Sequence, residues 1–288
     1  MIDHDQNIRD ERKFAENCTV DVLATTRIPH EEYRKHPGLN QSYLRKVLEL
    51  GLERATFERD NPDEPTDDMI LGSVHHAYLS RHPEIMRSYE RAPKVDRRTK
   101  EGKAVWQALL DGLQPGATLV RDEIWDKAHL LADRAAEVRE QVLGIKDYTP
   151  DMTEVSLVAR VRFKTEELTL DCDIKGQLDL VYQKDKDSPV LVVDYKTSSS
   201  CAEIPVLRKS RDSMWALQAY TYCTLAAAHY KAPASAYYVV SSKDHDNARA
   251  YSFGQNSMIT GRHALASAVY RKMTQKGTDA EYTGITLL

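Results

Sequence analysis

The chain has 288 residues, of which 41% are hydrophobic and 29% are charged, and its formal net charge is −4. This composition predicts a globular protein with one large core. It does not indicate a surface coated in nucleic acid, although a local basic surface is compatible with it. No stretch approaches the roughly 18 apolar residues of a membrane span, and the polar N-terminus lacks the apolar segment of a secretory signal. We therefore expect a cytoplasmic protein.

The cysteines are too far apart in the sequence to form a CxxC pair, and no cluster of other metal-binding side chains accompanies them. We therefore expect free thiols in a reducing compartment, without zinc or an iron–sulfur cluster. The four residues are Cys18, Cys172, Cys201 and Cys223.

The N-terminal part of the chain is predicted to be helical. Residues 1–38 are polar and mixed in charge, and we expect a polar lead-in there, followed by a single domain over residues 39–288. Apolar residues at helical spacing predict a helix that starts near Asn40, with Asn40 or Ser42 as its cap. An acidic stretch with two prolines predicts a loop over 60–68. Further helices are expected near 69–81, 101–113 and 119–143.

From residue 154 onward the pattern changes to that of a sheet. Alternating apolar residues predict strands over 154–163 and 168–182, and Gly176 indicates a bulge or a close backbone approach in the second. The apolar run from Val190 to Val193 is typical of a central, buried strand. A helix capped by Asp212 or Ser213, two strands and a last helix are expected over 213–230, 234–241, 248–253 and 258–274. This order predicts an α/β fold with a mixed central sheet flanked by helices and an N-terminal helical portion.

Charged residues follow the central strand directly. Asp194 and Lys196 share one face of the strand because side chains alternate, and Asp179 would lie beside them if the preceding strand is a neighbour. Carboxylates are hard ligands that suit Mg²⁺. A lysine next to the metal can orient or deprotonate water and neutralise developing charge. The trio therefore predicts phosphodiester hydrolysis, and the alternative is an ordinary salt bridge at the end of a strand.

The tripeptide [DE]-x-K alone carries no information, because it occurs four times in the chain. Only one copy follows a buried strand and has an upstream aspartate on a predicted neighbouring strand. The copies are Glu11–Lys13, Glu101–Lys103, Asp173–Lys175 and Asp194–Lys196.

These residues resemble the signature of the PD-(D/E)XK nuclease superfamily, in which a G-x-L-D segment precedes an apolar strand that ends in D-x-K-T. Within it the chain resembles the RecB-type branch, and most of all the exonuclease VIII (RecE) catalytic domain and its phage relatives. The agreement covers about residues 39 to 255. It includes the segments LNQS at 39–42, GSVHH at 72–76, DRRTKEGK at 96–103 and QAYTY at 218–222. The resemblance implies a restriction-endonuclease-like core.

The resemblance also implies roles for individual residues. His76, Asp179 and Asp194 would bind the metal with the backbone carbonyl of Tyr195, and Lys196 would be the catalytic lysine. Gln218 and Tyr222, one helical turn apart, would complete the catalytic set by orienting the scissile phosphate or nearby DNA.

Several of these roles have alternatives that the sequence leaves open. His75 and His76 point about 100° apart on a helix, so only one of them faces the site easily. Gln218 and Tyr222 could instead belong to a buried aromatic helix face. Some relatives place an acidic residue near the metal where Glu154 begins the first core strand.

A basic run between residues 94 and 103 is a candidate DNA-binding segment, and the alternative is a solvated loop. Its proposed DNA contacts are Arg97, Arg98, Lys100 and Lys103.

The resemblance implies a Mg²⁺-dependent exonuclease, with Mn²⁺ as a substitute, that degrades linear double-stranded DNA from 5′ to 3′ in phage-type recombination. It further implies DNA ends and a single-strand annealing protein as partners, a homo-oligomeric ring, and a phage or prophage origin in a bacterial host cell. The rival hypotheses are a single-strand or flap nuclease of the same fold, and a DNA-binding protein that has lost activity. A two-carboxylate glycosidase fits less well, because a lysine stands beside the acids and no aromatic sugar platform lies near them.

Overall fold

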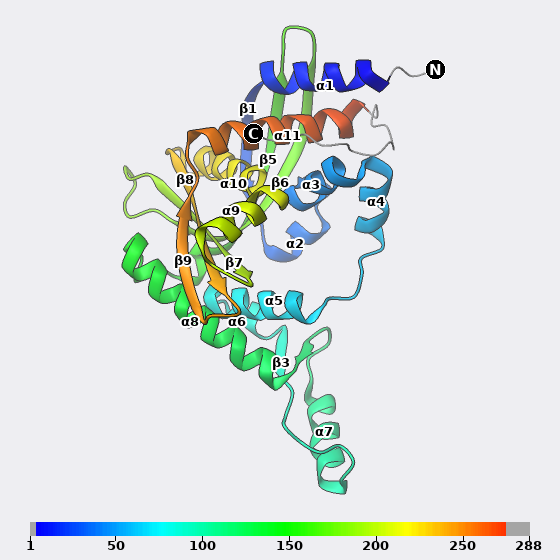
Figure 1. Cartoon of the computed structure of the whole chain (residues 1–288), viewed down its shortest axis with the longest axis vertical. Helices are drawn as coiled ribbons and strands as arrows, with labels where there is room; N and C mark the ends of the chain where they lie inside the picture. Colours follow the sequence, from blue (N-terminus) through cyan, green and yellow to red (C-terminus); the bar gives the residue numbers. More distant parts are fainter. Residues whose placement is uncertain (1–3, 275–288) are drawn as a thin grey trace.

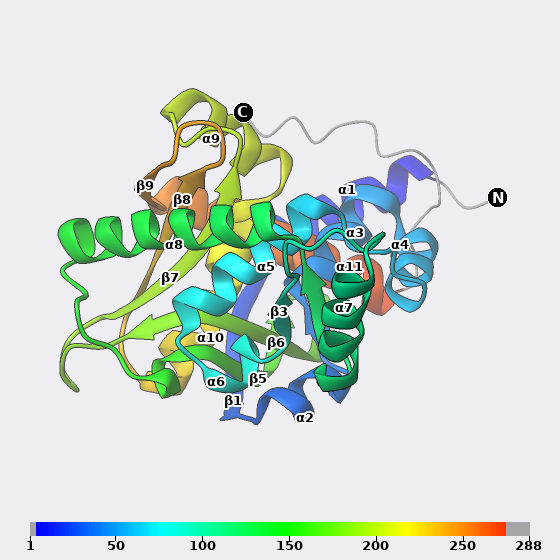
Figure 2. The same cartoon turned by 90° about the horizontal axis from the view of Figure 1, so that it is seen from below.

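The computed structural model describes residues 4–274, and Figures 1 and 2 show it from two sides. Its centre is a seven-stranded sheet with the order β1-β5-β6-β7-β8-β9, in which β2 also pairs with β6. The β2–β6 and β7–β8 pairs are parallel and the other pairs are antiparallel, so the predicted mixed sheet is confirmed. The strands are β1 (Thr19–Arg27), β2 (Leu39–Asn40), β5 (Thr153–Lys164), β6 (Thr169–Tyr182), β7 (Val190–Ser198), β8 (Ala234–Ser242) and β9 (Asn247–Ser252).

Helices cover both faces of the sheet (Figure 2). The larger core lies under four helices: α1 (His4–Asn17), α3 (Gln41–Leu50), α10 (Trp215–Tyr230) and α11 (Gln255–Thr274). On the other face, α5 (Asp67–Ser80) packs on α8 (Asp122–Leu143), and both contact the middle of the sheet. Among residues 4–274, no helix has the length and apolarity needed to cross a membrane.

The structure corrects the prediction for the first 38 residues. β1 is an edge strand of the sheet, paired antiparallel with β5, and α1 packs on α11 with the rings of Phe14 and Tyr270 5.2 Å apart. β1 leaves all of its side chains partly or fully exposed, as an edge strand does, and only its partly buried Val20 and Val22 pack against the core. The described part of this segment is therefore integral to the fold. Residues 275–288 of the predicted domain lie outside the described residues.

Most of the other predicted elements are present, with shifted ends. The helix expected from Asn40 is interrupted at Gly51, whose φ of 81° breaks it into α3 and α4 (Leu52–Asp60). Asn40 is the cap of α3 and accepts a hydrogen bond from the Tyr43 N–H at 2.8 Å. Neither Asp212 nor Ser213 caps α10; its N-cap is Met214 in a left-handed conformation, and α9 (Glu203–Asp212) ends just before it.

Shorter elements connect the strands and the long helices. The sequence did not predict β3 and β4, which form a separate two-stranded sheet at the base of α7 (Figure 1). These elements are α2 (His30–Lys35), α6 (Pro83–Met86), β3 (Tyr89–Arg91), α7 (Lys100–Gly112), β4 (Thr118–Val120) and the 3-10 helix Pro150–Met152. All four cysteines are free and buried.

Candidate active site

The candidate site lies where β6 and β7 separate. The two strands pair only at the three positions from Leu180↔Val193 to Tyr182↔Leu191. Beyond Val193, β7 continues along β8, whereas β6 continues along β5 and β2. Backbone groups at such a fork cannot pair strand to strand, and the Tyr195 N–H instead donates to Asp179 Oδ2 at 2.8 Å. The predicted proximity of the strand carrying Asp179 to that carrying Asp194 is therefore confirmed.

Three acidic residues stand in a row across the fork. Extending the β6–β7 register by one residue from Leu180↔Val193 places Asp179 opposite Asp194. On the other side, the β5–β6 register places Asp179 opposite Glu154, between the pairs Thr153↔Leu180 and Val155↔Leu178. Like charges opposite each other on neighbouring strands are destabilising, so the three acids lower the stability of the fold at this point. Such a local exception to the rules of stability is expected at a functional site.

Lys196 and Gln218 hold the Asp194 carboxylate from two sides. The Nζ of Lys196 lies 2.6 Å from Asp194 Oδ2, and Gln218 Nε2 donates to Oδ1 at 2.8 Å. Asp194 is only 1% exposed, whereas the Lys196 side chain remains 22% exposed. The ammonium group therefore neutralises a buried acid while keeping contact with the solvent side of the site.

His76, rather than His75, faces the acids. His76 Nδ1 lies 3.2 Å from Asp179 Oδ2, and its side chain is 28% exposed. His75 is fully buried, and its Nε2 lies 3.2 Å from Ser241 Oγ. The choice between the two histidines, which the sequence left open, thus falls on His76.

The acids and His76 shift one another's pKa values. Burial raises the pKa of Asp194 to about 6; Lys196 opposes this and Asp179 adds to it. Burial also raises the pKa of Glu154 to about 8, and the charges of Asp179 and Asp194 contribute. Burial would raise the pKa of Asp179 too, but His76 and Lys196 hold it below its usual value. Burial would lower the pKa of His76, but Asp179 raises it to about 9.

Tyr222 is packed beneath the acids. It is 6% exposed, and burial raises its pKa well above the usual value, so its hydroxyl stays protonated. A Cβ on Gly176 would lie 2.8 Å from Leu225 Cδ1 and 3.0 Å from Tyr222 Cε1, so the glycine is the close approach predicted from the sequence. Gln218 touches the acid directly, whereas Tyr222 fills the space between α10 and β6.

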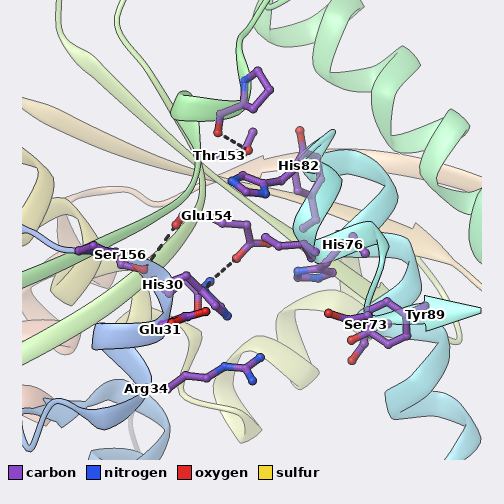
Figure 3. A pocket seen from close by; sticks show the side chains of 18 of the residues that line it. His30, Glu31, Arg34, Ser73, His76, His82, Tyr89, Thr153, Glu154 and Ser156 are labelled. Atoms are coloured by element: carbon purple, nitrogen blue, oxygen red, sulfur yellow. Dashed lines mark hydrogen bonds between the residues drawn. The ribbon is translucent and has the colours of Figure 1, made fainter. Parts of the chain in front are cut away.

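A large cavity opens over this site. Its volume is about 1650 Å³, and it is lined by residues of α2, α5, β5, β6 and β7, including His76, Glu154 and Lys196. In Figure 3 the Glu154 side chain lies between those of His30 and His76. A cavity of this size admits a polymer segment as well as a small molecule.

The donor set fits a hard divalent cation. Asp194 Oδ2 is buried and faces the Lys196 ammonium, whose Nζ lies 2.6 Å away. A cation between the acids would also relieve the repulsion that raises the pKa values of Glu154 and Asp194. Within residues 4–274 no three His, Cys, Asp or Glu side chains are already grouped so that they could hold a metal.

The predicted DNA-binding run lies outside the cavity lining. Lys100 and Lys103 are on α7, which extends away from the sheet, and Arg97 and Arg98 precede it (Figures 1 and 2). The Arg97 guanidinium stacks on Trp106, 4.4 Å from the ring centroid. These residues therefore lie apart from the residues that line the cavity.

Two residues beside the acids, Gln177 and His30, were not predicted from the sequence, and Glu154 was predicted only as an option. Gln177 Nε2 donates to Glu154 Oε2 at 2.7 Å and lies 2.8 Å from His30 Nδ1. Gln177 lies two positions before Asp179 in the same strand, which is the only signal that could have indicated it. His30 belongs to the segment that was expected to be a polar lead-in.

Comparisons with known proteins agree with the fold. The family model of the PD-(D/E)XK nuclease superfamily matches residues 42–282. No curated protein matches the sequence. A crystal structure of a candidate exonuclease from Eubacterium rectale is similar, with a TM-score of 0.53 and 11% identity over 87% of this chain and 88% of that chain. At this identity the similarity shows a shared fold alone.

Two further structures are more distant. Rai1 from Scheffersomyces stipitis has a TM-score of 0.29 and 9% identity, covering 91% of this chain and 85% of that chain. Rai1 from Candida albicans, in complex with pU5 and Mn²⁺, has a TM-score of 0.27 and 11% identity, covering 88% and 71%. TM-scores this low do not establish a common fold.

Proposed function

Because this chain belongs to the PD-(D/E)XK nuclease superfamily, whose model matches most of its length, we propose that it is a Mg²⁺-dependent exonuclease acting on linear double-stranded DNA. One observation carries the proposal. The Lys196 ammonium stands 2.6 Å from the Asp194 carboxylate, next to Asp179, at a fork in the sheet under a cavity of about 1650 Å³. An acid pair can hold a catalytic divalent cation, and an adjacent lysine can orient or deprotonate the attacking water.

Asp179, Asp194 and the Tyr195 carbonyl would hold the cation, and Glu154 would supply a third carboxylate from β5. His76 stands against Asp179 at 3.2 Å, and it would either give up its proton and join as a ligand through neutral imidazole, or stay protonated and fix the carboxylate from outside. When bound, Mg²⁺ polarises the phosphoryl oxygen and stabilises the leaving oxygen. We expect Mn²⁺ to substitute.

Lys196 would act on the attacking water. Its side chain reaches the cavity while its ammonium is held by Asp194, so it can orient the water and neutralise charge that develops on phosphorus-bound oxygens. Gln218 keeps Asp194 in one rotamer through its 2.8 Å hydrogen bond. Tyr222 supports Gln218 from below and would keep α10 at the right distance from the acids.

The finer assignments rest on the resemblance to the RecE-type nucleases. They are 5′-to-3′ polarity, a role in phage-type recombination with a single-strand annealing protein, and a ring of subunits around the DNA. A phage or prophage origin and the cytoplasm of a bacterial host belong to the same proposal. The alternative is a single-strand or flap nuclease of the same fold. A non-catalytic DNA-binding role is disfavoured because Asp179, Asp194 and Lys196 are all in place.

The test is degradation of linear duplex DNA, labelled at its 5′ or 3′ end, with Mg²⁺ or EDTA. Circular, single-stranded and flap DNA serve as competing substrates. Wild-type protein should remove one labelled end only when Mg²⁺ is present, and Lys196→Ala should lose this activity while still binding DNA. The matched control is Lys186→Ala in the turn between β6 and β7. Absence of cleavage by wild-type protein, or full activity of Lys196→Ala, would refute the assignment.

A further inference from the structure

Gln177 connects the acidic row to the opposite wall of the cavity. Its Nε2 donates to Glu154 Oε2 at 2.7 Å and lies 2.8 Å from Nδ1 of His30. The three residues come from β6, β5 and α2, and all three line the cavity. Figure 3 shows the hydrogen bond at the Glu154 carboxylate beside His30.

Glu154 needs such support because its backbone is strained. It has a φ of 48°, the left-handed region that residues other than glycine rarely adopt, although it lies in strand β5. Strain of this kind persists only where the surroundings over-determine the conformation, and it clusters at functional sites. Repulsion from Asp179 and Asp194 would also drive the Glu154 carboxylate out of the row. The hydrogen bond from Gln177 holds the carboxylate against this repulsion.

The chemistry of the amide fixes the role of His30. In its ionised form, the one that would bind a cation, the Glu154 carboxylate only accepts hydrogen bonds, so the Gln177 NH₂ group must face it. The same nitrogen faces His30 Nδ1, and since an amide nitrogen only donates, Nδ1 must be the acceptor. Rotating the amide to serve His30 as a donor would place Gln177 Oε1 against the carboxylate. Glu154 and an accepting His30 Nδ1 therefore favour the same orientation of the Gln177 amide.

Helix α2 is itself anchored to the strand that carries Gln177. The buried Lys175 donates from Nζ to the carbonyls of Tyr33 at 2.8 Å and His36 at 2.7 Å. Lys175 and Gln177 are two residues apart on β6, so one strand fixes both the helix and the amide. The position of His30 is thus determined by the contacts of the α2 segment with strand β6.

We propose that Gln177 is a positioning residue that holds Glu154 in the acidic row, and that His30 in turn orients Gln177. The inference rests on the proposed function in taking the row to be a divalent-metal site. It makes the N-terminal segment part of the active centre, because α2 sets the geometry of a carboxylate on β5. Removing an outer partner of a metal-binding group costs about 10- to 100-fold in metal affinity or activity.

The first experiment replaces Gln177 with leucine, which keeps the approximate volume and removes the amide. Mn²⁺ affinity is measured by isothermal titration calorimetry without DNA, and the Mg²⁺ concentration for half-maximal cleavage is measured separately. We expect Gln177→Leu to weaken both about 10-fold or more. The matched control is Gln183→Leu, whose amide bonds only to its own turn through Lys186 O and Ser188 O, and it should change neither.

The second experiment separates the hydrogen bond from packing and does not depend on Gln177→Leu folding well. His30→Asn keeps an acceptor, because asparagine Oδ1 can occupy the place of Nδ1, whereas His30→Ala removes it. We expect His30→Ala to weaken Mn²⁺ binding several-fold and His30→Asn to restore most of the loss. Thermal unfolding without metal serves as the check that both variants are folded.

The outcomes separate this inference from the proposed function. Wild-type protein that binds Mn²⁺ but cleaves no DNA refutes the nuclease assignment and leaves the positioning role to be decided by the calorimetry. Unchanged Mn²⁺ affinity and Mg²⁺ dependence in folded Gln177→Leu overturns the positioning role. Equal losses in His30→Asn and His30→Ala refute the orienting hydrogen bond.

Discussion

Glu154→Gln should change how the stability of the metal-free protein depends on pH. Burial, with the neighbouring charges of Asp179 and Asp194, raises the pKa of Glu154 from the usual 4.5 to about 8. The folded state therefore binds this proton more tightly than the unfolded state. Unfolding releases the proton between those pH values, so the free energy of unfolding falls as the pH rises through this window. Glutamine cannot ionise, and it can still accept the hydrogen bond from Gln177.

The magnitude follows from the pKa. Moving a carboxyl pKa from 4.5 to about 8 at 1.36 kcal/mol per pH unit corresponds to about 5 kcal/mol if the group is wholly enclosed. Glu154 lines the cavity and is only half-buried, so solvent stabilises part of its charge. We therefore expect Glu154 to contribute about 2–3 kcal/mol to the loss of stability between pH 5 and pH 8.5. The variant should lose that much less than the wild type.

The assay is urea unfolding in EDTA at several pH values between 5 and 8.5, for wild type, Glu154→Gln and the exposed-residue control Glu53→Gln. Burial also raises the pKa of Asp194, to about 6, so the protein loses stability as Asp194 ionises with rising pH. This loss occurs in the wild type and in both variants, so the difference between their profiles reports Glu154. Added Mg²⁺ should stabilise the wild type more at pH 8.5 than at pH 5, because a cation binds the ionised acids. Parallel pH profiles for wild type and Glu154→Gln would refute the reasoning.

Three further predictions concern other parts of the molecule. Gly261→Ala would place a Cβ 2.1 Å from the Ala216 carbonyl oxygen where α10 and α11 cross, so urea unfolding should show a free energy of unfolding lower by about 3 kcal/mol or more. The control Gly112→Ala, whose Cβ would have nothing within 4 Å, should leave the free energy of unfolding nearly unchanged. Asp194→Asn should weaken Mn²⁺ binding and cleavage together, and a loss of cleavage with unchanged Mn²⁺ affinity would exclude Asp194 as a ligand. The double variant Lys100→Ala, Lys103→Ala should bind DNA more weakly at low salt and lower the slope of log affinity against log salt by about 2; an unchanged slope would remove α7 from the DNA path.

The sequence predicted the centre of the fold well because its buried strands have an unambiguous pattern. The runs that became β5, β6 and β7 are apolar or alternate between apolar and polar residues. Gly176 stands out in its strand because a Cβ there would clash with α10, so the glycine itself indicates the close approach. The same strands carry Asp179, Asp194 and Lys196, so the proximity of these residues follows once β6 and β7 are neighbours, as the structure shows. Edge elements such as β1 bury too little to show a pattern, and their pairing depends on contacts with β5 that are distant in sequence.

The rest of the site depends on long-range geometry. Gln177 and Glu154 meet because β5 and β6 are in a particular register, and His30 joins them from a segment almost 150 residues away along the chain. Nothing in the polar sequence around His30 indicates that α2 would lie against the sheet. Such contacts follow from the folded topology and not from local propensity.

Lys175 illustrates how the structure resolves a motif that the sequence could not. Asp173–Lys175 has the same [DE]-x-K spacing as Asp194–Lys196 and also lies on a strand, yet the two lysines face different surroundings. Lys175 donates to the backbone carbonyls of Tyr33 in α2 and of His36 just after it, no ion pair joins it to an acid among residues 4–274, and burial lowers its pKa. Lys196 points at a buried acid beside the cavity. The spacing determines only that an acid and a lysine share a face of a strand. The structural difference is that Lys196 lines the cavity beside the fork between β6 and β7, whereas Lys175 is occupied by the carbonyls of the α2 segment.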